Sequence, residues 1–251
     1  MSSFEEYGRR YQCVRMTRSD GVLEVTLHTQ GDSLIWGAGP HQELPDAFAD
    51  IGADRDNRGV ILTGAGKNFC GERDSSTSGS RNSSEGWDKI YWEGKRLLEN
   101  LLNIEVPVIA AVNGPARYHA EIAALSDIVL VSDTALFQDK AHFIQDIVPG
   151  DGVQVVWQTL LGPNRGKYFL LTGQELTASE AKALGIAAEI HSADRLMDRA
   201  RQLAREMAAK SPLTLRYTRV VLTQSMKEAL LKGVGYGLSL EGLAILGRKS
   251  S

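Results

Sequence analysis

His142 and Asp151 are the two residues whose types first point to chemistry, and both lie in the stretch TALFQDKAHFIQDIVPGDG, residues 134–152. A histidine oriented by a carboxylate can act as a general base near neutral pH, because its ordinary pKa lies close to that pH. The stretch begins as a short apolar strand and ends in a Pro-Gly-Asp-Gly turn before VQVVWQTLLG, a predicted helix. A loop separates the two side chains in sequence, so their contact is a prediction.

The composition predicts one large α/β domain, or a core with a helical appendage, for a chain of 251 residues. A net charge of −3 without a basic stripe argues against nucleic acid as a partner. Two cysteines, Cys13 and Cys70, make no disulfide framework. The first residues are polar, and no apolar run of membrane-spanning length stands out, so we expect a cytoplasmic protein without a membrane partner.

The elements that must position these residues begin with a predicted β-hairpin over residues 13–29, turning at Ser-Asp-Gly. His28 falls on its second strand and is more simply a strand-face or core histidine than a catalytic one. Trp36 and His41 then precede a predicted helix, and RGVILTGAG supplies a buried strand. This β-β-α-β order is typical of α/β folds, which bind ligands at strand-to-helix loops.

The middle of the chain combines one very polar segment with regular elements. Residues 75–86 are rich in Gly and Ser and predict a mobile loop, either a lid over a site or a solvated excursion. A helix with a leucine stripe follows over WDKIYWEGKRLLENLLNIEV, and PVIAAVNG is typical of a strand buried on both faces. A short helix in ARYHAEIAALSD and strands at DIVLVSD and TALF complete this part.

The C-terminal third is predicted to be almost entirely helical, apart from a small strand at AAEIH, residues 187–191. Caps such as Thr177 and Ser192, and breaks at Gly, Asn or Pro, separate the predicted helices. These are LLGPNRGKYFLLTGQ, TASEAKALGI, ADRLMDRARQLAREMAAKS, PLTLRYTRVVLTQ and MKEALLKGVGYGLSLEGLAIL. We therefore expect an α/β core over residues 1–190 and a helical region over residues 191–251, which work as one unit.

Six segments occur in order along the chain: VILTGAGKNFC, PVIAAVNGPA, SDIVLVSDTALF, IVPGDG, NRGKYFLLTGQELTASEAKALGI and the SPLTLRYTR helix. In this order they resemble the crotonase (enoyl-CoA hydratase/isomerase) superfamily over nearly the whole chain. The resemblance implies a crotonase-like core, a spiral of ββα turns, with a helical C-terminal trimerisation region. It also implies assembly as a homotrimer or a dimer of trimers.

Two segments depart from that family pattern. Members that bind acyl-CoA have small residues after the Phe of the first segment, where this chain has CGERD, residues 70–74. They also have a glycine run where this chain has PARYHAE, residues 115–121, which is one residue shorter and without glycine. Glycine lets backbone N–H groups close on an oxyanion, because it lacks a Cβ. The departure argues against thioester chemistry and indicates that a side chain meets the substrate there.

Further short motifs are HTQGDSLIW, PHQEL, FCGERD, HAEI, AHFIQDIVPGDG and SLEGLA. They resemble the branch of the superfamily that breaks carbon–carbon bonds in β-diketones, the 6-oxocamphor hydrolase type. Seven residues match positions with proposed roles in that branch: Trp36, His41, His119, Glu121, His142, Asp151 and Glu241. The resemblance implies a cofactor-free hydrolase that converts a cyclic or bicyclic β-diketone into a keto acid by a retro-Claisen reaction.

In that reaction, water adds to one carbonyl and the carbon between the carbonyls leaves as an enolate. We assign the base role to His142, with Asp151 fixing its tautomer and supporting its imidazolium. His119, His41 and the Trp36 indole N–H are donors for the oxyanion and the departing enolate.

Two carboxylates have supporting roles in this assignment. Glu121 stands roughly where crotonase hydratases keep a catalytic carboxylate, and here it assists the reaction or holds His119. Glu241, on the predicted C-terminal helix, can orient another histidine or a water. Both are placed with Trp36 among the substrate-binding residues, and a supporting or structural role is a simpler explanation for each carboxylate than a direct chemical one.

Simpler explanations exist for other residues as well. Asp151 also suits a helix N-cap, and Trp36 also suits plain packing. Three histidines with carboxylates can describe a metal site, but the chain has no short HxH or HxxxH pair, so we expect no metal. Cys70 has no histidine beside it in sequence, and we do not expect it to be a nucleophile.

Three functions remain open at this point. The first is a C–C hydrolase without a cofactor, whose partner is a small cyclic diketone. The second is an acyl-CoA hydratase or isomerase with an unusual site, and the third is a crotonase scaffold without catalysis.

Overall fold

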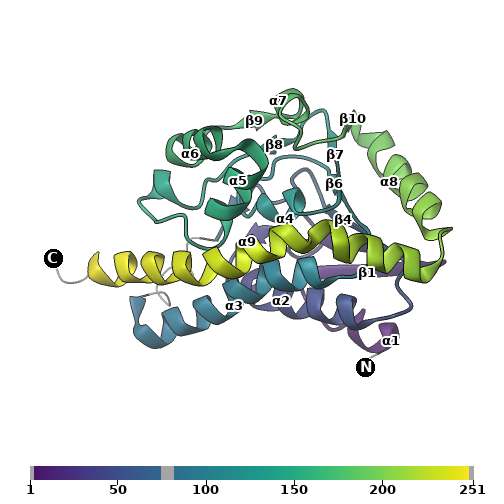
Figure 1. Ribbon diagram of the computed structural model, residues 1–251, viewed down its shortest axis with the longest axis horizontal. Helices are drawn as coiled ribbons and strands as arrows, with labels where there is room; N and C mark the ends of the chain where they lie inside the picture. The colour runs from purple at the N-terminus through teal and green to yellow at the C-terminus, as the bar shows by residue number, and fades with distance from the viewer. Residues whose placement is uncertain (1–2, 75–81, 249–251) are drawn as a thin grey trace.

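The computed structural model describes residues 3–74 and 82–248, which form a six-stranded sheet covered by helices (Figure 1). The first two strands are the predicted hairpin and run antiparallel, and every later neighbour is parallel. Its turn has positive φ at Asp20 and Gly21, as a tight two-residue hairpin turn requires. In spatial order the strands are β1 (Val14–Ser19), β2 (Val22–Leu27), β4 (Gly59–Gly64), β6 (Val108–Val112), β7 (Ile128–Ser132) and β10 (Glu189–His191).

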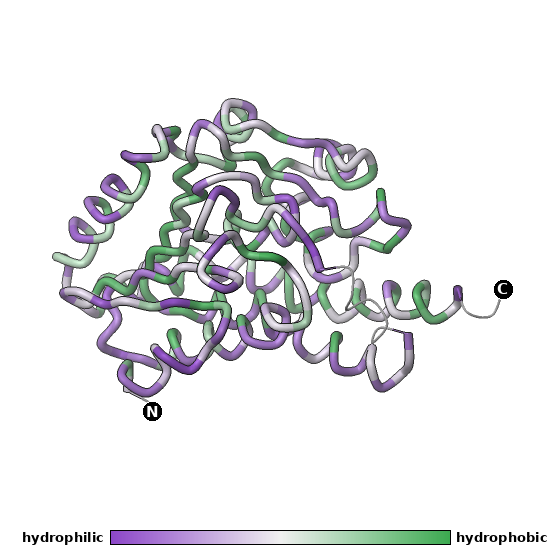
Figure 2. The backbone as a smooth tube through the Cα atoms, turned by 180° about the vertical axis from the view of Figure 1, so that it is seen from behind, coloured by the Kyte–Doolittle hydropathy of each residue, from purple (hydrophilic) through white to green (hydrophobic). Residues whose placement is uncertain are grey.

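The central strands are almost entirely apolar, as is typical where both faces of a sheet are buried: β6 is VIAAV, and β4 contains VIL followed by the buried Thr63. Successive side chains alternate between two cores: Val60 and Leu62 enter the large core, whereas Ile61 enters a smaller one beneath the helix α8. Figure 2 shows this as hydrophobic strands inside a more hydrophilic shell of helices. The predicted α/β core is confirmed in this respect.

The helices and short strands that surround the sheet follow the predicted order. Two small sheets pair β3 (Ile35–Trp36) with β5 (Glu72–Arg73) and β8 (Leu136–Phe137) with β9 (Leu176–Thr177). The helices are α1 (Phe4–Tyr7), α2 (Ala38–Ala53), α3 (Ser84–Asn103), α4 (Glu121–Ala124), the 3-10 turn η2 (Phe143–Gln145), α5 (Val153–Leu161), α6 (Pro163–Thr172), α7 (Ala178–Ala183), α8 (Ala193–Ala208) and α9 (Pro212–Gly247).

The prediction of two separate C-terminal helices is wrong, because α9 is a single helix of 36 residues. Its glycines do not break it; they let it approach its neighbours closely. A Cβ on Gly237 would lie 2.2 Å from the carbonyl oxygen of Gly150, and one on Gly242 would lie 2.1 Å from the indole nitrogen of Trp87. In Figure 1, α9 runs lengthwise beside α3, which it contacts.

A buried cation fastens α9 to the end of α3. Arg219 is 2% exposed and donates to Asp127 and to the carbonyl oxygens of Leu102 and Ile104. A guanidinium at a helix C-terminus satisfies carbonyl groups that have no partner within the helix. The C-terminal region is thereby held against the core.

In the described parts of the chain, α9 is the one helix long and apolar enough to cross a membrane. This differs from the expectation that no apolar run reaches that length. However, 39% of its most apolar window is buried inside the protein, and the core helix of a soluble protein passes the same test. The feature is therefore weak support for a membrane partner.

Three local predictions differ from the structure. His41 does not precede its helix but lies in the first turn of α2, where its N–H donates to the carbonyl of Gly37. The loop predicted over residues 75–86 ends earlier, because α3 begins at Ser84 with Ser83 as its N-cap; residues 75–81 lie outside the described residues. Thr177 caps α7 through its side chain, whereas Ser192 makes no side-chain cap bond.

Candidate active site

A cavity of about 220 Å³ lies between the segments that follow β6 and β8 and the helices α2, α3 and α9. Of the seven residues predicted to form the site, Glu121 does not line this cavity, because it is buried behind His119. The other six line it: Trp36, His41, His119, His142, Asp151 and Glu241. Loops and helices far apart in sequence therefore converge on one space.

His142 has a carboxylate at each of its ring nitrogens. Nδ1 is 2.7 Å from Oδ1 of Asp139, and Nε2 is 3.3 Å from Oδ2 of Asp151. Both His142 and Asp139 are 4% exposed. The structure brings His142 and Asp151 into contact, but the nitrogen that a tautomer-fixing carboxylate would hold is bonded to Asp139, which sequence reasoning did not single out.

These partners determine the charge of His142. Burial alone lowers the pKa of an imidazole, because it penalises the cation, but the carboxylates of Asp151 and Asp139 outweigh it. They hold the pKa of His142 well above its ordinary value of 6.5. Conversely, burial raises the pKa of Asp151, and the opposite charges of His142 and His119 outweigh this and lower it. Both shifts favour the imidazolium–carboxylate form of this pair.

Asp151 sits in a turn that glycines make possible. Gly152 has φ +116°, a conformation that side chains rarely adopt, and a Cβ on Gly150 would lie 2.3 Å from the carbonyl oxygen of Gly237 on α9. The N-cap of α5 is Gly152, and Asp151 has only a long contact of 3.5 Å to the N–H of Val153. The N-cap explanation for Asp151 is therefore not what the structure shows.

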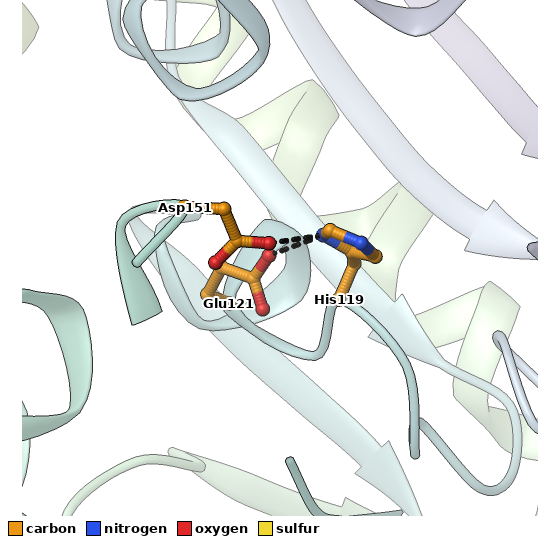
Figure 3. A group of neighbouring side chains, drawn as sticks. All are labelled: His119, Glu121 and Asp151. Atoms are coloured by element: carbon orange, nitrogen blue, oxygen red, sulfur yellow. Dashed lines mark hydrogen bonds and ion pairs between the residues drawn. The ribbon is translucent and has the colours of Figure 1, made fainter. Parts of the chain in front are cut away.

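His119 occupies the segment where family members that bind acyl-CoA carry glycines, and its backbone keeps a glycine-like conformation with φ +49°. Its Nδ1 is 2.8 Å from Oε1 of Glu121 and 3.7 Å from Oδ2 of Asp151 (Figure 3). Its ring lies 3.7 Å from the indole of Trp36, centroid to centroid, at 30°. Among the described residues, none bonds to Nε2, so this nitrogen is available to a ligand.

Burial and neighbouring charges also have opposite effects on the pKa values of His119 and Glu121. Burial raises the pKa of Glu121 more than His119 lowers it. Burial would lower the pKa of His119, but the carboxylates of Glu121 and Asp151 outweigh it and raise that pKa. His119, Glu121, Asp139 and His142, which are buried, and Asp151, which is partly buried, form one group of opposite charges, which we call the buried cluster.

A second histidine–carboxylate pair faces the cavity from two helices. Nδ1 of His41 on α2 is 2.7 Å from Oε2 of Glu93 on α3, and we call these two residues the helical pair. Oε1 of Glu93 is 3.6 Å from Nζ of Lys89, whose side chain is 60% exposed. Glu93 therefore connects a histidine of the cavity wall to a group in solvent.

The rest of the wall is apolar on the α3 and α9 side, with two further cations. Trp87, Ile90 and Leu238 contribute apolar surface, and the Trp87 indole N–H donates to the carbonyl of Leu238. Glu241, 5% exposed, faces the cavity from α9. Arg73 and Lys89 also reach the wall, as a pocket that takes a polar molecule requires.

The two segments that depart from the acyl-CoA pattern are bonded to each other. The N–H of Cys70 donates to the carbonyl of Pro115, and the carbonyl of Cys70 accepts from the N–H groups of Arg117 and Tyr118. Burial raises the pKa of the Cys70 thiol, which disfavours the nucleophilic thiolate.

His119, Glu121 and Asp151 also present three atoms within 4.8 Å of one another, a grouping that could hold a metal ion. Each of these atoms already faces an opposite charge within the buried cluster. The two imidazoles therefore already occupy the positions beside these carboxylates that a cation would take. The expectation that the site uses no metal stays a prediction.

Sequence reasoning missed Asp139 and Glu93. Glu93 had a signal, because it lies on the apolar stripe of α3 between Ile90 and Leu97, where a charged residue needs a partner. Asp139 is three residues before His142, and nothing in the sequence distinguishes it from an ordinary loop aspartate.

Comparisons with known proteins give a consistent picture. A family model described as enoyl-CoA hydratase/isomerase matches residues 17–239. The carnitinyl-CoA dehydratase of Shigella flexneri is 30% identical over 217 residues, which are 81% of this chain and 77% of that protein. The protein of the same name from Salmonella arizonae is 29% identical over 238 residues, 90% of this chain and 85% of that one.

Among solved structures, a β-diketone hydrolase from the cyanobacterium Anabaena sp. PCC 7120, bound to (S)-3-oxocyclohexyl acetic acid, matches with a TM-score of 0.95. It is 47% identical and covers 97% of this chain and 98% of its own. An enoyl-CoA hydratase/isomerase from Mycobacterium paratuberculosis has a TM-score of 0.86 at 24% identity, covering 94% of each chain. The latter likeness concerns the fold alone.

Proposed function

The chain belongs to the enoyl-CoA hydratase/isomerase (crotonase) family, and we propose that it is a cofactor-independent hydrolase of cyclic or bicyclic β-diketones. The observation that carries this proposal is a cavity lined by histidines paired with carboxylates, one of which, His119, stands where a glycine run would serve a thioester. The likeness to a β-diketone hydrolase supports it. The molecule bound in that relative is a keto acid, which is the product class of the proposed reaction.

In the first step, a water oxygen adds to one carbonyl carbon while Nε2 of neutral His142 takes the water proton. The carbonyl becomes a tetrahedral alkoxide. Nε2 of His119 and the Trp36 indole N–H are the proposed donors to this oxyanion. Asp151, beside Nε2 of His142, stabilises the imidazolium that forms.

In the second step, the C=O bond re-forms and the bond to the central carbon breaks, so that this carbon leaves as an enolate. The enolate oxygen accepts a hydrogen bond from His41. Its carbon takes the proton back from the His142 imidazolium, which returns the base to its starting state. The carboxylic acid product then loses a proton at neutral pH and becomes the keto carboxylate.

Acyl-CoA chemistry is the second candidate, because the two carnitinyl-CoA dehydratases match 81% and 90% of the chain. In this alternative, Glu121 would be the catalytic carboxylate. Its position behind His119, away from the cavity wall, does not support a direct role. We therefore place this candidate second.

The test uses purified protein in EDTA, without CoA, and a panel of cyclic 1,3-diketones followed by loss of their absorbance. Parallel reactions contain crotonyl-CoA. We expect turnover of at least one diketone, and His142→Ala should abolish it while His28→Ala, a histidine outside the cavity, should not. Turnover of crotonyl-CoA alone would reject the proposal, and inertness toward both substrates would favour a scaffold without catalysis.

We also propose that the chain assembles as a homotrimer or a dimer of trimers. Large apolar side chains along α9 are more than half exposed in the single chain: Leu213, Tyr217, Val221, Leu222, Leu231, Tyr236 and Leu243. Such a surface is typical of a protein interface. Light scattering on a sizing column should give three or six times the chain mass, and a monomer would contradict the proposal.

A cytoplasmic location is likewise proposed. Cys13 and Cys70 are both free and buried, as in proteins of reducing compartments. Fractionation of the source cells, with immunodetection of the chain, tests this location.

A further inference from the structure

The two carboxylates that face His142 are not equivalent. Asp139 makes a bond of 2.7 Å to Nδ1, whereas Asp151 is 3.3 Å from Nε2 and also 3.7 Å from His119. Asp151 lines the cavity, but Asp139 does not. One carboxylate is therefore placed behind the imidazole and the other beside its reactive face.

Asp139 has few interactions other than the one with His142. Its second oxygen, Oδ2, is buried and has no hydrogen-bond partner in the described structure. A buried carboxylate oxygen without a partner is costly, and proteins keep such a group where its charge has a use. The carboxylate of Asp139 thus interacts mainly with the imidazole of His142.

The backbone around Asp139 is held from both sides. The N–H of Gln138 donates to the carbonyl of Ala116, and the N–H of Lys140 donates to that of Arg117. The side-chain amide of Gln138 donates to the carbonyl of Gly173. These bonds fix Asp139 relative to the segment that carries His119.

From this geometry we propose that Asp139 is the positioning residue of the reaction, which holds the Nδ1 proton of His142 so that Nε2 is the nitrogen that meets water. The inference rests on the proposed function of the cavity. Asp151 then acts on the other side of the ring, next to the proton that arrives at Nε2. This division of roles replaces the assignment of tautomer control to Asp151.

Other charged groups also act on His142 and must be kept constant in a test. Asp151 faces it from the turn before α5, and His119 from the segment before α4. Glu241 on α9 and Arg73 on β5 line the same cavity. A variant at Asp139 leaves all four in place.

The kinetic test compares Asp139→Asn and Asp139→Ala with Asp133→Asn, an exposed aspartate on the preceding turn. We expect kcat on the diketone to fall by about 100-fold in both Asp139 variants, with KM nearly unchanged. Without the anion, the limb of the pH profile that belongs to His142 should move to lower pH by about one pH unit or more. In a His142→Ala background, Asp139→Asn should have no further effect.

NMR of protein labelled with 15N-histidine tests the same inference without substrate. We expect His142 to carry its proton on Nδ1 when neutral. The Asp139→Asn substitution should lower the pKa of the His142 imidazole. If the variant moves neither the imidazole pKa nor the pH profile, and alters only thermal stability, the inference is overturned. If NMR shows the change but no diketone is turned over, the positioning stands and the proposed function fails.

Discussion

In one part of the cavity wall, His119 and His142 share three carboxylates, whereas His41, on α2, has a single carboxylate partner, Glu93. The buried cluster is closed: His142 and His119 are 4% and 9% exposed. The helical pair continues through Glu93 to Lys89, whose side chain is in solvent. The histidines of the buried cluster are therefore shielded from water, whereas the helical pair is linked through Glu93 to a solvent-exposed cation.

The backbone conformation also differs between the helical pair and the buried cluster. His41 and Glu93 lie in α2 and α3, where helix geometry sets their positions. His119 has φ +49°, and His142 has φ −113° with ψ −106°, outside any regular element. Strained or irregular backbone persists where the surrounding contacts determine it, and it is concentrated at functional sites. The comparison supports the proposal that the buried cluster carries the chemistry and that the helical pair assists it.

The largest expected effect comes from removing the imidazole at the centre of the buried cluster. His142→Ala should lower kcat on a cyclic diketone by about 10³-fold, because it removes the proposed base. Initial rates by absorbance measure this, with His28→Ala as the control. Retention of more than a tenth of the activity would place the base elsewhere.

The next effect concerns the charge behind His119. Glu121→Gln keeps the shape of the side chain but removes the carboxylate that raises the pKa of His119, so His119 becomes a weaker donor to the oxyanion. We expect kcat to fall by about 100-fold. A change confined to KM would show that Glu121 shapes the pocket instead.

The pH dependence of kcat/KM separates the two walls directly. Because Asp151 and Asp139 hold the pKa of His142 well above 6.5, the imidazolium persists to higher pH than that of a free histidine, and the base is blocked while it persists. Activity should therefore rise about tenfold per pH unit on an acid limb whose midpoint lies above 6.5. A limb centred at or below 6.5 would contradict this electrostatic account.

A smaller effect is expected on the helical pair. Glu93→Gln removes the charge behind His41 but leaves the buried cluster intact, so kcat should fall by about tenfold and the acid limb should stay in place. The pH profile of the variant is the measurement that matters. A shift of the limb would mean that the two walls are coupled.

The smallest effect is expected at the solvent end of the helical pair. Lys89→Gln removes an ion pair in which one partner is 60% exposed, and such pairs contribute about 0–1 kcal/mol. We expect kcat within about twofold of the unaltered enzyme, measured beside Glu93→Gln. A loss as large as that of Glu93→Gln would make Lys89 part of the site.

Much of the fold could be predicted from local patterns. The spacing of apolar residues fits one kind of element in each of three places: the hairpin over residues 13–29, the buried strands and the leucine stripe of α3. The break predicted within α9, between Gln224 and Met226, is wrong, because the helix continues through Ser225 without interruption. In the structure, Gly237 and Gly242 allow close contacts with Gly150 and Trp87, and packing outweighs the low helix propensity of glycine.

The sequence by itself determined which residue types are available at the site, and the segment around His119 already argued against a glycine-built oxyanion hole. The tertiary structure alone decided which carboxylate serves which histidine. Asp139 meets Nδ1 of His142, Asp151 lies between His142 and His119, and Glu121 is behind the wall. The physical reason is that a hydrogen bond depends on the direction of two side chains to within a few tenths of an ångström, and loop sequences do not encode that direction locally.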